Sequence, residues 1–299
     1  MRLAVIGAGG FVGQQIARLS QDYGVSALLL NDLTDFDAPE GSRKLIGSFS
    51  ERHIASELCD ADALIVLASI LGGAAEQNYP LARQINVDAT LSLFEQVRDK
   101  NPTCRVVFAS SIAVLGDLAG PVTDTTEARP TMVYGAQKLM METALSQFTR
   151  RGWLDGVSLR LSGVMARDGA DAALKTAFMS RLFWRVARSE DITLPVSPSA
   201  TTWLTSVTVA AQNFLLGATL PDLGDRRAFT LPAQYVTFAD LVSAVKAAHP
   251  KSQSVVTFDP DPDLDQLFGR FPPLSTPTAD ALGFVRDDTL QALVANSMT

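Results

Sequence analysis

The chain opens with MRLAVIGAGGFVG (residues 1–13), in which a short apolar run is followed at once by a cluster of glycines. Gly7, Gly10 and Gly13 form a G-x-x-G-x-x-G pattern between a predicted strand, Leu3–Ile6, and a stretch with helical periodicity. Glycines at the entry to a helix let the backbone approach a pyrophosphate, which the positive end of the helix dipole attracts. The pattern predicts a dinucleotide-binding turn. A tight strand–helix turn without a ligand is the alternative.

The succession of apolar strand and helix repeats through the first 160 residues. Apolar runs with few charges lie at 3–6, 27–30, 63–67, 106–109 and 157–161. Continuous apolarity is typical of parallel strands that are buried on both faces. Helical periodicity marks the stretches 11–23, 74–100 and 131–151. We therefore expect an α/β fold, a Rossmann-type doubly wound parallel sheet with helices on both faces.

Beyond residue 164 the texture of the sequence changes. Ten of the 15 prolines lie after residue 194, and the apolar runs between them are short. We expect a nucleotide-binding Rossmann domain over residues 1–164 and a smaller α+β substrate-binding lobe over 165–203 and 231–299. The segment at about 204–230 is expected to return to the sheet domain.

Composition excludes several classes of protein. With 47% hydrophobic and 19% charged residues the chain is globular, and its net charge of −7 argues against nucleic-acid or membrane partners. Cys59, Cys104 and two histidines cannot form a disulfide framework or a multi-ligand metal site, so we expect no metal. The apolar start lacks the features of a signal peptide, and no apolar window reaches about 18 residues. The cytoplasm is the expected location.

Asp32 ends the second predicted strand, 19 residues after Gly13. A carboxylate at this place can accept hydrogen bonds from both ribose hydroxyls of an adenosine, and it would repel a 2′-phosphate. No Lys or Arg follows it before Arg43. These features favour NAD over NADP as the cofactor; a loop Asp that caps a turn is the alternative.

Tyr134 and Lys138 are spaced i, i+4 on the helical stretch 131–151 and so share one face. Ser110 and Ser111 follow a buried strand, at the edge where parallel sheets bind ligands. A tyrosine can act as a base if its pKa falls from about 10 towards neutrality, which takes about 4 kcal/mol. A neighbouring ammonium and a positive nicotinamide both favour that fall. The group predicts alcohol oxidation; an exposed Tyr–Lys pair beside a polar strand end is the alternative.

On these motifs the sequence resembles the extended short-chain dehydrogenase/reductase superfamily, and within it the D-erythronate dehydrogenase-like members. The resemblance spans nearly the whole chain and includes residues 134–169, PVSPSATTWLTS (195–206), FDPDPDLDQL (258–267) and ADALGF (279–284). In that superfamily the catalytic Ser stands five residues before the Gly of an S-x-x-V-x-G run. Here SIAVLG places it at Ser111, not at Ser110.

The resemblance implies specific roles for residues of this chain. Ser111 would hold the substrate oxygen, Tyr134 would be the base, and Lys138 would lower the pKa of Tyr134 and hold the nicotinamide ribose. Besides Gly7, Gly10, Gly13, Asp32, Tyr134 and Lys138, the expected NAD contacts are Phe11 and Val12 along the pyrophosphate, Ser48 and Phe49 at the adenine, Leu67, Ala68, Ser69 and Asn86 at the nicotinamide ribose, and Ser162, Gly163 and Val164 at the carboxamide.

The chain departs from its look-alikes where they bind a sugar acid. It reads Trp184-Arg185-Val186 where an Arg-Glu-Pro stretch is expected, and Thr201 stands where an Arg is expected. Since a guanidinium grips a carboxylate best, Arg167 and Arg185 are candidates to replace the missing arginines. They are otherwise ordinary surface residues. The predicted substrate contacts are Ser69, Ser111, Ser162, Arg167, Arg185 and Thr201.

These observations lead to three hypotheses about the function. The leading hypothesis is an NAD-dependent dehydrogenase that oxidises a secondary alcohol of a small polyhydroxylated substrate, a sugar acid resembling D-erythronate. The resemblance also implies a homodimer built on helices that include the one carrying Tyr134. A nucleotide-sugar epimerase or dehydratase with tightly held NAD would use the same residues, but it usually needs a larger, more basic lobe. A non-catalytic NAD-sensing module typically lacks the Tyr–Lys pair.

Overall fold

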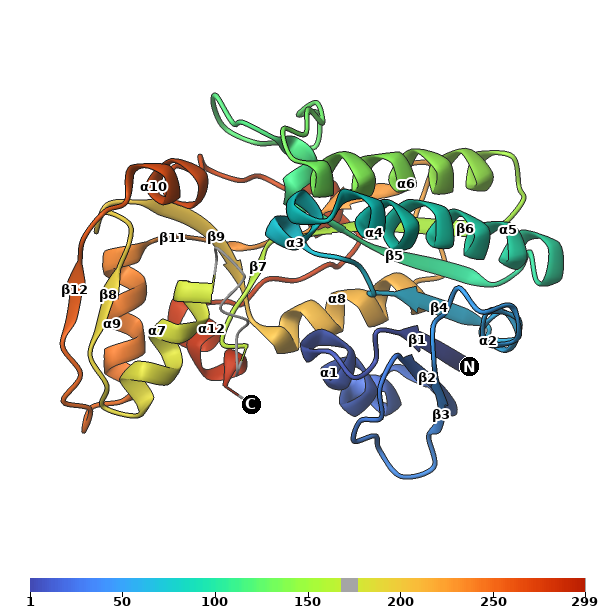
Figure 1. Ribbon diagram of the computed structural model, residues 1–299, viewed down its shortest axis with the longest axis horizontal. Coiled ribbons are helices and arrows are strands. Elements are labelled where there is room, and N and C mark those ends of the chain that lie inside the picture. The colour runs from blue at the N-terminus through green and yellow to red at the C-terminus, as the bar shows by residue number, and fades with distance from the viewer. Residues whose placement is uncertain (168–176, 299) are drawn as a thin grey trace.

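A seven-stranded parallel sheet forms the body of the protein (Figure 1). The computed structural model describes residues 1–167 and 177–298, so 168–176 of the predicted second lobe and residue 299 lie outside it. All pairings in this sheet are parallel. In spatial order its strands are β10 (Ala228–Thr230), β6 (Asp155–Leu161), β5 (Arg105–Ser111), β4 (Ala63–Val66), β1 (Arg2–Ile6), β2 (Ala27–Asp32) and β3 (Arg43–Ile46). The predicted doubly wound sheet is confirmed.

Helices cover both faces of this sheet (Figure 1). One face carries α2 (Arg52–Leu58), α3 (Gly72–Gln77), α4 (Tyr79–Arg83), the π-helical turn η2 (Gln84–Ala89), α5 (Thr90–Lys100) and α6 (Val133–Arg150). The other carries α1 (Phe11–Leu19), the 3₁₀ turn η1 (Ser20–Tyr23), α8 (Val207–Thr219) and α11 (Pro277–Ala281). Within the described ranges, none of the helices is both long enough and apolar enough to cross a bilayer.

The helical stretch expected over 74–100 is divided in the structure. Asn78 leaves the helical region with φ −133° and ψ 71°, and its Oδ1 accepts a hydrogen bond from Leu81 N at 3.2 Å. Pro80 follows inside the first turn of α4, where its missing N–H costs nothing. The stretch therefore bends between α3 and α4, which periodicity alone did not indicate.

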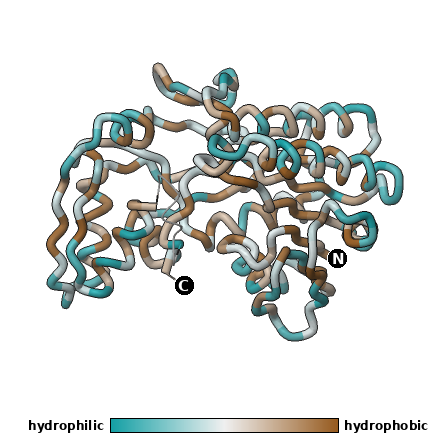
Figure 2. Tube along the Cα trace, in the orientation of Figure 1, coloured by the Kyte–Doolittle hydropathy of each residue, from teal (hydrophilic) through white to brown (hydrophobic). Residues whose placement is uncertain are grey.

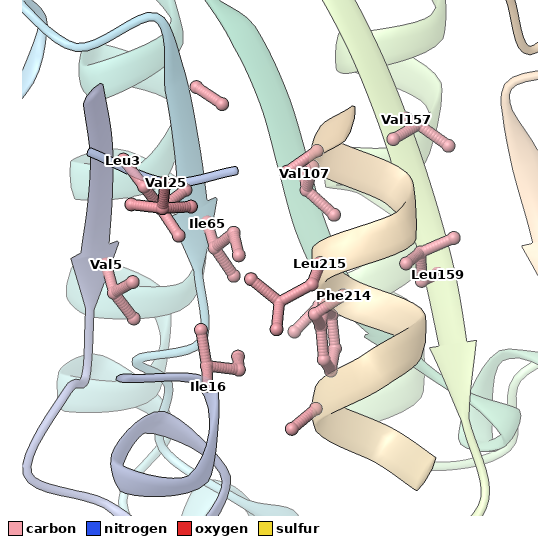
Figure 3. Close-up of a cluster of buried hydrophobic side chains, with 14 of the residues drawn as sticks. Leu3, Val5, Ile16, Val25, Ile65, Val107, Val157, Leu159, Phe214 and Leu215 are labelled. Atoms are coloured by element: carbon pink, nitrogen blue, oxygen red, sulfur yellow. The ribbon is translucent and has the colours of Figure 1, made fainter. Parts of the chain in front are cut away.

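Helix α8 fills the face of the sheet opposite α6 (Figure 3). Phe214 and Leu215 are fully buried and pack toward Val107 and Leu159 of the two neighbouring strands. Gly217 lets the helix approach closely, because a Cβ there would lie 3.1 Å from a Leu159 methyl and 3.2 Å from a Val107 methyl. The apolar centre of the sheet is visible in Figure 2 as the brown segments between the two helical layers.

A second lobe lies beyond the carboxyl ends of the strands (Figure 1). Its sheets are β11-β9-β7 and β12-β8. The strands are β7 (Gly163–Val164), β8 (Ile192–Leu194), β9 (Thr201–Thr205), β11 (Gln234–Thr237) and β12 (Val256–Phe258), and the helices are α7 (Ala177–Ala187), α9 (Phe238–Ala248), α10 (Pro262–Phe268) and α12 (Leu290–Ser297). Between β9 and β11 the chain passes through α8 and β10, which belong to the main sheet.

Candidate active site

The glycine-rich turn links β1 to α1 at the carboxyl edge of the sheet. Gly7 has φ +84°, and the N–H groups of Gly7 and Ala8 both donate to Asn31 O, at 2.9 and 3.0 Å. Gly13 lies so close to this turn that a Cβ would stand 2.3 Å from Gly7 O. The first turn of α1 therefore packs directly on the backbone of the loop, with its positive end at the sheet edge.

A cavity of about 480 Å³ opens beside this turn. Its lining residues are Gly9, Gly10, Gln14, Asp32, Thr34, Asp35, Phe36 and Asp37. Asp32 Oδ2 accepts the Gly9 N–H at 2.8 Å, and Oδ1 accepts the Leu33 N–H at 2.7 Å. These two bonds fix the carboxylate at the end of β2, facing the turn.

Ser111, Tyr134 and Lys138 meet at the carboxyl end of β5. Ser111 begins the 3₁₀ turn η3 (Ile112–Leu115), and its Oγ accepts the Ala113 N–H at 3.1 Å. Helix α6 approaches this turn so closely that a Cβ on Gly135 would lie 2.2 Å from Ala113 O. The lack of a side chain at Gly135 thus allows Tyr134 to lie near the Ser111 hydroxyl.

Several neighbours act on the Tyr134 phenol. Burial raises its pKa, while the hydroxyls of Ser69 and Ser111 and the charge of Arg167 act in the opposite direction. Ser69 Oγ is itself buried and has no hydrogen-bond partner of ordinary geometry among the described residues. A buried polar atom without a partner needs an explanation, and a ligand bound beside Tyr134 would supply one.

Lys138 is almost completely buried, with 2% of its surface exposed. Its Nζ donates to Ala109 O at 2.7 Å and lies 4.6 Å from the centre of the Phe108 ring and 5.6 Å from that of Tyr134. Burial lowers the pKa of Lys138 to about 7, and the Glu142 carboxylate acts against this shift. The ammonium therefore titrates near neutrality.

Asn86 holds the loop after β4, which carries Leu67, Ala68 and Ser69. Its Oδ1 accepts the Ile70 N–H at 2.8 Å, and its Nδ2 donates to Ile70 O at 2.9 Å and to Gln137 Oε1 at 2.8 Å. These bonds tie the loop to η2 and α6. The structure thus gives Asn86 a positioning role behind the residues predicted at the nicotinamide ribose.

The two residues predicted at the adenine, Ser48 and Phe49, have different surroundings in the structure. Ser48 lies in a turn, where its Oγ is 2.7 Å from Ser50 Oγ and its N–H donates to Glu51 Oε1 at 2.9 Å. Phe49 is 5% exposed and belongs to the apolar cluster that α2 covers. Its ring is core.

The chain that leaves β6 carries the predicted carboxamide and substrate residues. Ser162 is buried, and Gly163 and Val164 form β7, paired with β9. Arg167 places its guanidinium 6.0 Å from the centre of the Phe11 ring, and its charge reaches Tyr134. This brings Arg167 between the cofactor turn and the predicted base.

Arg185 and Thr201 make structural contacts instead. Arg185 donates to Asp191 O at 2.8 Å and pairs with Glu190 at 3.8 Å, both in the turn after α7. Thr201 Oγ1 donates to Phe271 O at 2.7 Å. Each side chain therefore holds a loop of the second lobe.

The comparisons with known proteins agree with this geometry. The family model described as the NAD dependent epimerase/dehydratase family matches residues 3–203. The chain belongs to that family. It is 31% identical to the D-erythronate dehydrogenase of Cupriavidus necator, over 98% of this chain and 97% of that one. The corresponding Haemophilus influenzae enzyme is 28% identical over 98% of both chains.

A solved structure extends the likeness to three dimensions. It is described as a nucleoside-diphosphate-sugar epimerase from Agrobacterium tumefaciens and superposes with a TM-score of 0.89 at 29% identity, covering 98% of this chain and 92% of that one. The predicted resemblance to extended short-chain dehydrogenases is confirmed, and so is NAD as the cofactor of this family member.

The described residues fit NAD. Gly10 at the start of α1 and Asp32 both line the cavity, where they would meet a pyrophosphate and a ribose, and the buried Ser69 hydroxyl lies near Tyr134. The sequence prediction omitted Gly9, Gln14 and Phe36, which line the cavity. Gly9 stood in the quoted motif, whereas the loop around Phe36 carried no sequence signal.

The turn generates a first prediction. Gly13→Ala introduces a Cβ 2.3 Å from Gly7 O, so the turn must open, and we expect NAD to bind at least about tenfold more weakly. Titration of the cofactor by calorimetry measures this. Gly120→Ala is the matched control, because a Cβ at Gly120 meets no atom of the described residues within 4 Å. Unchanged NAD affinity in a folded Gly13→Ala protein would contradict the assigned turn.

Proposed function

We propose that the protein is an NAD-dependent dehydrogenase that oxidises a secondary alcohol of a small sugar acid resembling D-erythronate. The observation that carries the proposal is the convergence of Ser111, Tyr134, Lys138 and Arg167 at one end of the cofactor site. Two full-length relatives that are named D-erythronate dehydrogenases support the substrate class.

In this proposal each residue acts on one part of the alcohol. The Ser111 hydroxyl holds the substrate oxygen, and Tyr134 removes the hydroxyl proton as the carbon loses a hydride. Bound NAD supplies the hydride acceptor and a positively charged ring. Lys138, when protonated, favours the tyrosinate, because an ammonium next to the phenol lowers its pKa. The products are a ketone, NADH and one released proton.

The substrate carboxylate requires a cation, and Arg167 is the residue that we favour. Its guanidinium lies 6.0 Å from the centre of the Phe11 ring and its charge reaches Tyr134, so it lies beside the reacting groups. Arg185 and Thr201 are engaged in the turns after α7 and α10. Ser69 and Ser162, which are near the predicted nicotinamide site, remain proposed contacts of the substrate hydroxyls.

The function is tested by following NADH at 340 nm with four- to six-carbon aldonic and uronic acids, neutral polyols and simple alcohols. We expect turnover of an aldonate with NAD and a loss of about 10²–10⁴ in kcat for Tyr134→Phe, with NAD still bound. Tyr235→Phe, at an exposed side chain of β11 in the second lobe, is the control and keeps full activity. Full turnover by Tyr134→Phe would refute the assigned base.

The carboxylate assignment has its own test. For Arg167→Met we expect the KM for the aldonate to rise about tenfold or more, because a charge-assisted bond is lost, while the KM for a neutral polyol changes little. The same substitution at Arg185 tests the competing assignment and should leave both constants within about twofold. A larger effect at Arg185 would transfer the role to that residue.

The second candidate function is the epimerase or dehydratase reading, which the Agrobacterium structure's description favours. Such an enzyme reduces its NAD only transiently. NAD that co-purifies with the protein and is never released as NADH with any panel substrate would support it over the dehydrogenase.

We further propose a homodimer through the α6 face of the sheet. Tyr79 and Leu81 on α4 and Met140 on α6 are exposed apolar side chains on two helices that pack together. An apolar surface on adjacent helices favours association with a second copy. Light scattering should therefore give about twice the chain mass of 32.0 kDa, and Met140→Glu should lower it. A monomeric mass for the unmodified protein would exclude the dimer.

We place this activity in the cytoplasm. Cys59 and Cys104 are both free and buried, which suits a reducing compartment where NAD is available. Fractionation of the source cells, with activity in the membrane or secreted fraction, would oppose this location.

A further inference from the structure

A buried ion pair lies one helical turn beyond Lys138 on α6. Arg160 of β6 donates from Nε to Glu142 Oε1 at 2.9 Å and from Nη2 to Oε2 at 2.8 Å, with a further Nε contact to Oε2 at 3.2 Å. The Glu142 side chain is 4% exposed and the Arg160 side chain 14%. Because burial removes the hydration of both charges, such a pair adds little net stability. A functional role would therefore explain its presence.

Lys138 and this pair occupy the same layer between α6 and the sheet. Residues 138 and 142 share one face of the helix. Lys138 Nζ binds Ala109 O on β5, and the next residue, Ser110, is paired in register with Arg160 on β6. The carboxylate of Glu142 is therefore one helical turn from Lys138 and is bound to Arg160, and its charge acts on the Lys138 ammonium.

We propose that the Glu142–Arg160 ion pair is a positioning element that sets the charge of Lys138 and, through it, the basicity of Tyr134. Among the described residues, Lys138 has one hydrogen-bond acceptor, the Ala109 carbonyl, and two aromatic rings lie beside its ammonium. Its ammonium therefore depends on a nearby negative charge. The role of Tyr134 rests on the proposed function, whereas the control of Lys138 does not.

Removal of either charge of the pair should shift the pKa of Lys138, in opposite directions. Glu142→Gln removes the negative charge and leaves the Arg160 cation, so the pKa of Lys138 should fall. Arg160→Gln leaves an uncompensated carboxylate beside Lys138, so the pKa should rise. Arg160→Lys restores a cation and should return the value towards that of the unmodified protein.

Other charged groups on the elements around Lys138 have partners of their own. On α6 itself Tyr134 faces Lys138, and Arg167 acts on that tyrosine. Among the others, Glu76 of α3 accepts the Val133 N–H, Asp88 of η2 pairs with Arg83, Arg98 of α5 pairs with Asp99, and Arg105 of β5 pairs with Asp155 of β6. Glu142 is thus the carboxylate whose change should move the Lys138 titration.

The experiment titrates Lys138 directly in the cofactor-free protein. The chain has six lysines, so ¹³C-lysine labelling gives six ε-methylene signals, and Lys138→Met assigns the one of interest. We expect the Lys138 midpoint to fall by about one pH unit in Glu142→Gln and to rise by about as much in Arg160→Gln. Midpoints that stay within about 0.3 unit in both variants would overturn the proposal, by the same principle.

A second variant guards against misfolding, since either single change leaves a buried charge unpaired. Glu142→Met with Arg160→Met replaces the pair by apolar side chains of similar volume, which buried pairs often tolerate. Because the charge of Glu142 acts on Lys138, the double variant should have a midpoint between those of Glu142→Gln and the unmodified protein. A midpoint above that of the unmodified protein would contradict the proposed effect of Glu142.

Enzyme activity provides a second, independent test of the proposal. With the best aldonate of the panel, the alkaline limb of the kcat/KM profile, where Lys138 loses its proton, should shift in the same direction as the Lys138 midpoint, since this profile reports the free enzyme. The plateau of Glu142→Gln should fall through kcat rather than KM. Shifted midpoints without any NADH formation would refute the proposed function alone, and NADH formation with unmoved midpoints would refute this inference alone.

Discussion

The close approach of α6 to the turn after β5 is the contact on which the reacting groups depend. There is no space for a side chain between Gly135 and Ala113 O, so the helix packs directly against the turn that follows the strand. From that one point the helix repeat places Tyr134 beside Ser111, Lys138 over Ala109 O and the next turn over β6. A bulkier residue at 135 would move all of these together.

The cofactor half of the site also depends on a close contact between backbone segments. Gly13 against Gly7 O sets the start of α1, and the bonds from Gly7 and Ala8 to Asn31 O join that turn to β2, where Asp32 follows. Both halves lie at the carboxyl edge of one parallel sheet, which is where such sheets bind ligands. The chemistry therefore rests on rigid elements and not on long loops.

This dependence explains what could be predicted from the sequence. The sheet type, five of the seven strands of the main sheet and the Tyr134–Lys138 spacing are local patterns, and the sequence was sufficient for them, whereas β3 and β10 were not predicted. The pairing of Glu142 with Arg160, the Gly9 bond to Asp32 and the bond from Thr201 to Phe271 join residues 18, 23 and 70 positions apart. No periodicity carries such information, because each bond exists only after the lobes and layers have packed.

The substrate end is built differently, and this bears on how its specificity can vary. Trp184 Nε1 donates to Ala166 O at 2.9 Å, and Trp203 Nε1, from a fully buried side chain, donates to Pro272 O at 2.7 Å, so two indoles hold segments of the second lobe. These anchors lie outside α6 and the glycine turn. Changes at positions such as Arg185 and Thr201 can therefore alter loops of the second lobe while the hydride-transfer groups keep their geometry. The loss of the expected arginines there is thus compatible with an intact dehydrogenase, provided that another cation, which we assign to Arg167, meets the carboxylate.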